Sequence, residues 1–163
     1  MDLKATAYVF TFIMGFLSFS CKTTQMTYQS WLNSQVKEWK KLDPELIEAY
    51  QKFYDVPLEK VLYSENISLK LSFDAVTFDN KIYFKKKLLR KLLAHELEHV
   101  EQYRKNPFFL EEYVIKGAKS VLQKGQSAFK ISTIHENIEL EQAAIEKANS
   151  VWKSFKEAKD MGK

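Results

Sequence analysis

The chain has few of the residues that cross-linked or loop-rich folds require. Only one of its 163 residues is cysteine, so a disulfide framework is excluded. Glycine and proline are scarce, with 4 and 3 copies, which argues against an all-β sandwich and favours helices. The formal net charge of +4 is too small to indicate nucleic-acid binding, and we expect no nucleic-acid partner.

The residues that are present suit one globular domain. Hydrophobic residues make up 45% of the chain and charged residues 28%, a composition that folds and is not typical of disorder. The length favours a single domain, which we place at residues 28–163.

The first twenty residues differ from this domain. Residues 5–20 are apolar or small and uncharged, and the run ends at Cys21. The run is shorter than the ~20 residues that a membrane-spanning helix needs. It suits the hydrophobic region of a secretory signal. An uncleaved anchor helix, or a plain signal beside a free cysteine, would have the same pattern.

Residues 1–20 together with Cys21 resemble a bacterial lipoprotein signal, with the small residue Ser20 before the cysteine. This resemblance implies that the signal is removed and that Cys21 carries a lipid. Residues 21–27 would then form a short lipidated tether. The protein would be anchored in the bacterial cell envelope. The outer membrane is favoured over the inner one, because Lys22 is not the aspartate that commonly retains lipoproteins at the inner membrane.

The rest of the chain predicts a helix-dominated α+β domain. Helices are expected at 28–42, 45–54, 85–105, 106–125, and from a capping box at 133–136 to about residue 158. β-forming residues concentrate at 61–84, where 75–78 and 81–84 flank a two-residue turn. We therefore expect a small antiparallel sheet, based on this hairpin, beside the helix at 85–105.

A metal-binding motif lies on that helix, where His95, Glu96 and His99 match the pattern HExxH. Histidines four residues apart lie one turn apart on one helix face, so both imidazoles can bind one zinc ion. The glutamate after the first histidine can take a proton from zinc-activated water. Glu96 is therefore the candidate catalytic base.

The helix pattern places Glu96 within an apolar face. It lies near Leu92 and Val100 when residues are placed at about 100° intervals from His95, whereas polar residues such as Gln102 are assigned to the opposite arc. Burying a carboxylate without a partner is costly, and water on a metal ion would be a partner. The alternative is a pair of interfacial histidines beside a Glu96 that pairs with an arginine or lysine.

The third ligand is expected from the last helix. Glu141 is centred on the apolar face of that helix, while Glu139 falls on its solvent side. By the burial argument used for Glu96, Glu141 is the expected ligand. Ala144 and Ala148 are small enough to let this helix approach the HExxH helix closely. The alternative is that Glu141 pairs with a buried cation.

These motifs resemble a known class of enzymes. HExxH followed by a helical glutamate resembles the gluzincin class of zinc metallopeptidases. Residues 92–102, LLAHELEHVEQ, are similar to the metallopeptidase domain associated with extracellular contractile injection systems, which also has a hairpin before the helix and a later Leu-Glu-x-x-Ala, here at 140–144. The resemblance implies a zincin-like fold. It also implies that the zinc ligands are His95, His99 and Glu141 and that the catalytic base is Glu96.

Other candidates are less specific. Tyr103, Tyr113 and His135 are candidates for stabilising an oxyanion, although Tyr103 also suits packing. A basic cluster lies at the start of the HExxH helix, and it suits anionic lipid or an acidic substrate, although such clusters are more often solvated faces. The cluster consists of Lys85, Lys86, Lys87, Arg90 and Lys91.

The expected function is that of a zinc-dependent metallopeptidase, a membrane-anchored lipoprotein that hydrolyses peptide bonds in a peptide or protein with zinc-activated water. Zn²⁺ is the expected cofactor. Two alternatives stay open at this point. One is a non-catalytic envelope binding module with a structural or degenerate zinc site, and the other is a metal-free helical envelope protein.

Overall fold

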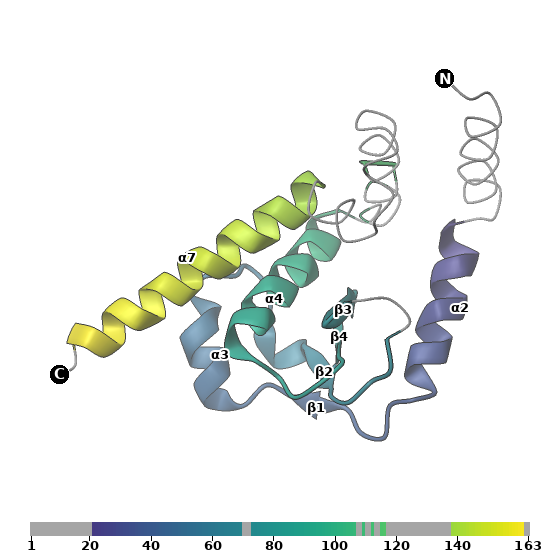
Figure 1. Ribbon diagram of the computed structural model, residues 1–163, viewed down its shortest axis with the longest axis horizontal. Helices are drawn as coiled ribbons and strands as arrows, with labels where there is room; N and C mark the ends of the chain where they lie inside the picture. Colours follow the sequence, from purple (N-terminus) through teal and green to yellow (C-terminus); the bar gives the residue numbers. More distant parts are fainter. Residues whose placement is uncertain are drawn as a thin grey trace, which may run out of the picture.

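The structure is a computed structural model that describes residues 21–69, 73–106, 109, 112, 115–116 and 138–161. Its elements, in chain order, are α2 (Cys21–Asn33), β1 (Lys40–Lys41), α3 (Pro44–Gln51), the 3-10 helix η1 (Leu58–Lys60), β2 (Leu62–Ser64), β3 (Ala75–Phe78), β4 (Lys81–Phe84), α4 (Arg90–Lys105) and α7 (Glu139–Met161). The predicted helix-dominated α+β class is confirmed (Figure 1). No helix within the described ranges combines the length and apolar character needed to cross a membrane.

The four strands form one mixed sheet in the order β1-β2-β4-β3. β3 and β4 are the predicted hairpin, paired antiparallel from Ala75 opposite Phe84 to Phe78 opposite Lys81. Asp79 has a positive φ of 55° in the turn, which short hairpin loops require and aspartate tolerates. β2 pairs parallel with β4 and antiparallel with β1, so β3 lies at one edge of the sheet.

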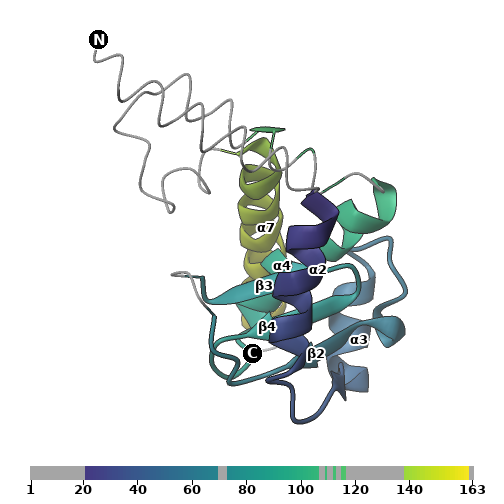
Figure 2. The ribbon, with the colours of Figure 1, turned by 90° about the vertical axis from the view of Figure 1, so that its right-hand side faces the viewer.

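The sheet is covered on both faces, which explains why β4 is so apolar. Ile82, Tyr83 and Phe84 are all fully buried, although successive side chains of a strand point to opposite faces. Ile82 and Phe84 pack in a cluster with residues of α3, α4 and α7. Tyr83 packs on the other side with Leu32 of α2. Figure 2 shows α2 in front of the sheet and α4 behind it.

Tyr50 of α3 and Tyr54, three residues after its end, hold the beginning of α4. The Tyr50 hydroxyl donates to the carbonyl of Arg90 at 2.7 Å, and the Tyr54 hydroxyl donates to the carbonyl of Ala94 at 2.6 Å. Burial raises the pKa of Tyr50 to about 12, so this hydroxyl stays a donor. The turn of α4 that precedes His95 is therefore fixed against α3.

α4 begins later than the predicted helix at 85–105. Leu89 is extended, with ψ of 131°, and the helix starts at Arg90. The backbone N–H of Leu88 donates to the Glu65 carboxylate at 2.7 Å, which holds the residues before α4 in a loop. Most of the predicted basic cluster therefore lies in this loop and not on the helix.

The N-terminal helix is also displaced from its predicted place at 28–42. α2 includes the expected tether, 21–27, and ends at Asn33. Beyond it the Gln35 amide donates to the Ser68 carbonyl at 3.3 Å and accepts from the Ser68 N–H at 3.0 Å. These contacts and the pairing of β1 with β2 replace helical hydrogen bonds.

Some predicted segments lie wholly or mainly outside the described residues. They are the signal at 1–20, the helix at 106–125 and the capping box at 133–136. The last helix is described as α7, from Glu139 to Met161.

Candidate metal centre

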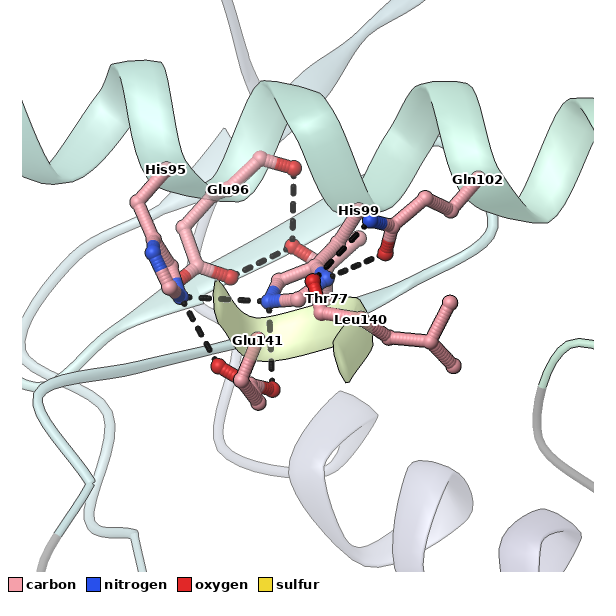
Figure 3. Close-up of polar contacts among 7 residues, drawn as sticks. All are labelled: Thr77, His95, Glu96, His99, Gln102, Leu140 and Glu141. Carbon is pink, nitrogen blue, oxygen red and sulfur yellow. Dashed lines mark hydrogen bonds and ion pairs between the residues drawn. The ribbon is translucent and has the colours of Figure 1, made fainter. Parts of the chain in front are cut away.

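The three predicted ligand side chains converge between α4 and α7 (Figure 3). Nε2 of His95 lies 3.1 Å from Nε2 of His99. The two carboxylate oxygens of Glu141 lie 3.3 Å from these nitrogens, Oε2 from that of His95 and Oε1 from that of His99. These side chains form a group that could hold a metal ion.

α7 brings Glu141 to the histidines because small residues follow it along the same helix face. Ala144 and Ala148 are buried in the contact with α4, and the Glu141 side chain is only 2% exposed. Glu139 is 78% exposed and forms an ion pair with Lys116 at 2.8 Å. Only Glu141 of these two glutamates therefore lies near the histidines.

The donor atoms lie close enough together to share one metal ion. Ligand atoms bound to zinc at about 2.0–2.1 Å in a tetrahedral arrangement lie about 3.3–3.4 Å apart. The two histidine nitrogens here are 3.1 Å apart, and each lies 3.3 Å from a different oxygen of Glu141. Two imidazoles and one carboxylate are also a donor set of catalytic zinc sites, which keep the fourth position open.

The same geometry controls the protonation of His99. Burial disfavours its charged form, but the hydrogen bond and negative charge of Glu141 outweigh that effect, with help from Glu96 and Gln102. Together they raise the pKa of His99 to about 9. Because a metal ligand must be the neutral imidazole, a proton and a metal ion compete for this histidine.

Gln102 orients His99, a contact that the sequence pattern did not reveal. Nδ1 of His99 lies 2.9 Å from Oε1 of Gln102. An amide oxygen only accepts hydrogen bonds, so Nδ1 carries the hydrogen and Nε2 is left to face the other ligands. The Gln102 amide also donates to the Leu140 carbonyl at 3.1 Å, beside Glu141. The contact could have been predicted from the sequence, because Gln102 is three residues after His99 and residues at this spacing are neighbours on a helix surface.

Thr77 of β3 is the second residue that the sequence did not reveal. Glu96 is buried, with 3% exposure, as its place in the apolar arc predicts. Its partner among the described residues is Thr77, whose hydroxyl donates to Oε2 of Glu96 at 2.7 Å, and no arginine or lysine of that part of the chain forms an ion pair with it. Thr77 is two residues from Ala75 in the predicted hairpin, so both point to the same face of the sheet.

The site opens into a groove of about 830 Å³. β3 forms one wall, and α4 and α7 form the other. Tyr103, one of the candidates for stabilising an oxyanion, lines this groove, whereas Tyr113 and His135 lie outside the described residues. The arrangement provides a metal centre, a buried carboxylate and room for an extended ligand.

The fold and the site define an α+β protein with a candidate metal centre. Residues 42–107 match the sequence model of the eCIS core domain, which links this part of the chain to contractile injection systems. The matched region extends from before α3 to the end of α4 and includes His95, Glu96 and His99, but it ends before Glu141. No curated protein and no solved structure matches the chain.

Proposed function

We propose that this protein is a zinc-dependent metallopeptidase of the bacterial cell envelope. The observation that carries the proposal is the convergence of His95, His99 and Glu141 in a groove that the buried Glu96 also lines. A bound zinc ion polarises a carbonyl group and makes water a stronger nucleophile. Three ligand side chains among the described residues, open to a groove, support a catalytic site over a closed structural one.

Glu96 acts as the general base in this proposal. Its carboxylate accepts a proton from the attacking water and gives it to the leaving amine. Thr77 is a positioning residue, because its hydrogen bond to Oε2 restricts rotation of the carboxylate. That contact also offsets part of the cost of burying a charged group.

The substrate is an extended segment of a peptide or protein. β3 is an edge strand and lines the groove along its length. An edge strand presents backbone N–H and C=O groups to which an extended peptide can add as a further strand. A peptide bound in this way would pass Glu96 and the three metal ligands.

Cleavage of an unfolded protein tests the function directly. Zinc-loaded protein is expected to release acid-soluble peptides from reduced casein, and a chelator that removes the metal is expected to stop the release. Added zinc should restore it, since the chelator leaves the ligand side chains chemically unchanged. If zinc-loaded protein is inert toward a broad set of unfolded proteins, the non-catalytic binding module becomes the better interpretation.

Anchoring through a lipid on Cys21 is the second part of the proposal. Cys21 is the only cysteine of the sequence, and it directly follows the apolar run of the predicted signal at residues 1–20. Cys21→Ala is expected to block maturation and to move the protein from the detergent phase to the aqueous phase, because the lipid supplies the membrane affinity. Phase partitioning and the mass of the mature protein measure this. Unchanged partitioning would contradict lipidation.

A further inference from the structure

The groove follows one face of α4, and its lining changes from one end to the other. Lys91, His95, His99 and Tyr103 all line it, at intervals of four residues, so they form a row along that helix face. The row is about 18 Å long at about 1.5 Å per residue. That is the length of about five residues of an extended peptide, with the metal centre in the middle.

The end of the groove at the start of α4 is basic. Lys86 and Lys87 from the preceding loop and Lys91 from the first turn of α4 are exposed and line the groove. Within the described part of the chain, none of these three groove lysines forms an ion pair. Arg90, in contrast, points to Glu45 and pairs with it at 2.8 Å. The groove lysines are therefore available to a ligand.

The other end of the groove is aromatic. It is lined by Tyr103 of α4, by Phe109 and by Tyr28 of α2. The rings of Tyr103 and Phe109 are 4.4 Å apart, and the ring of Tyr28 is 6.1 Å from that of Phe78. Tyr28 and Tyr103 are partly exposed, so both present apolar surface at this end.

β3, on the opposite wall, also has one end near the groove lysines and the other end near the aromatic rings. Its first residue, Ala75, pairs with Phe84, and the groove lysines follow Phe84 closely in the chain. Its last residue, Phe78, contacts Tyr28 at the aromatic end. Asp74 lines the groove just before β3, but the three groove lysines outnumber it. A peptide beside β3 would meet positive charge on one side of the metal centre and aromatic rings on the other.

We propose that the groove selects peptide segments with acidic side chains on one side of the cleaved bond and a large apolar or aromatic side chain on the other. This inference rests on the peptidase function proposed above. Carboxylates near the groove lysines are attracted by charges that form no ion pair within the described residues, and a groove strengthens that attraction relative to an open surface. The aromatic end gains buried apolar area when a large side chain fills it.

Anionic lipid is the other ligand that suits a basic loop, and the fold disfavours it. In Figure 1 α2 begins at its upper end, on the side of the molecule where α4 ends, whereas α4 begins at its lower end. In Figure 2, turned about the vertical axis, α2 again begins at its upper end. A lipid on Cys21 would therefore bring the upper end to the membrane and leave the groove lysines away from it.

Matched fluorogenic peptides test the inference with the zinc-loaded full-length protein. Each peptide has one Phe on one side of its centre and a pair of Glu or a pair of Gln on the other, in both orders. For one of the two orders of Phe and the charged pair along the peptide, the Glu peptide is expected to have a kcat/KM about tenfold above that of its Gln counterpart. The reason is that several weak exposed ion pairs add together. The advantage should shrink as salt is added, since salt screens exposed charges.

Two triple variants with equal changes of charge separate the groove from the surface. K86Q/K87Q/K91Q is expected to bring the ratio of Glu to Gln peptides to about one, because the attracting charges are gone. K37Q/K41Q/K60Q changes exposed lysines that do not line the groove and should keep the ratio. A wild-type ratio near one, or a ratio that survives in the groove variant, would overturn the inference and leave the peptidase function standing.

Peptide binding to zinc-loaded Glu96→Gln protein, measured by fluorescence anisotropy, gives a readout that needs no turnover. The Glu peptide should bind about tenfold more tightly than the Gln peptide, and the difference should vanish when the groove lysines are also changed. If the Glu96→Gln protein shows this difference in binding but the wild-type protein cleaves no substrate, the charge preference holds and the peptidase function fails. Equal binding of both peptides overturns the inference, as does lysine-dependent binding to phosphatidylglycerol vesicles with no preference between peptides.

Discussion

Replacing Glu96 with glutamine is expected to remove nearly all hydrolysis while zinc content and fold stay close to normal. Glutamine keeps the size of the side chain and its hydrogen bond with Thr77, but it cannot accept the proton of the attacking water. Loss of a general base lowers rates by roughly 10²–10⁴-fold, about 3–5 kcal/mol of barrier. Elemental analysis and cleavage of unfolded protein, measured on one preparation, check both parts.

Glu98→Gln is the matched control for this experiment. Glu98 lies on the same helix but does not line the groove, so the same chemical change there should leave cleavage intact. If Glu96→Gln loses the metal, then Glu96 is a ligand and its role as the base is wrong. If wild type and Glu96→Gln cleave equally well, another group takes the proton.

Removing any one of the three proposed ligands is expected to have a comparably large effect on metal binding. Wild-type protein should hold one zinc ion per chain, and His95→Ala or His99→Ala should abolish this, because two remaining ligands hold zinc poorly. Glu141→Ala should weaken affinity by roughly 100-fold or more, since a ligand supplies a substantial part of the binding free energy. Titration against a competing chelator measures the affinities.

Two further variants make the series specific. Glu139→Ala should bind zinc normally, because this glutamate is exposed and pairs with Lys116. Gln102→Leu should weaken binding by about 10–100-fold, since it removes the group that orients His99. Normal affinity in Glu141→Ala together with weak affinity in Glu139→Ala would show that the wrong face of α7 was assigned to the site.

The proposed ligands could be chosen from the sequence because each follows from local helix geometry. The spacing of His95 and His99 places both imidazoles on one face, whatever packs against that face. Glu141 was identified as the acid centred on an apolar helix face, and its side chain is 2% exposed. The hairpin that became β3 and β4 was likewise readable from alternation and a short turn.

Thr77 was not revealed by the sequence, because its role depends on a contact between segments that are distant in the chain. Thr77 reaches Glu96 only because β3 packs against α4, and periodicity within either segment carries no sign of this. The start of α4 was misplaced for the same reason, since Glu65 binds the backbone N–H of Leu88 from a strand-side loop. In both cases a tertiary hydrogen bond overrides or completes a local pattern.

The metal centre has a mechanical consequence, because its ligands come from two helices that are far apart in the chain. An ion held by His95, His99 and Glu141 would cross-link α4 to α7 and so tie together two parts of the chain that are more than 30 residues apart. The free energy of metal binding then adds to the free energy of unfolding. Removal of the ion would weaken the contact between the two helices and abolish activity at the same time. The supply of metal would then govern the lifetime of the folded protein as well as its chemistry.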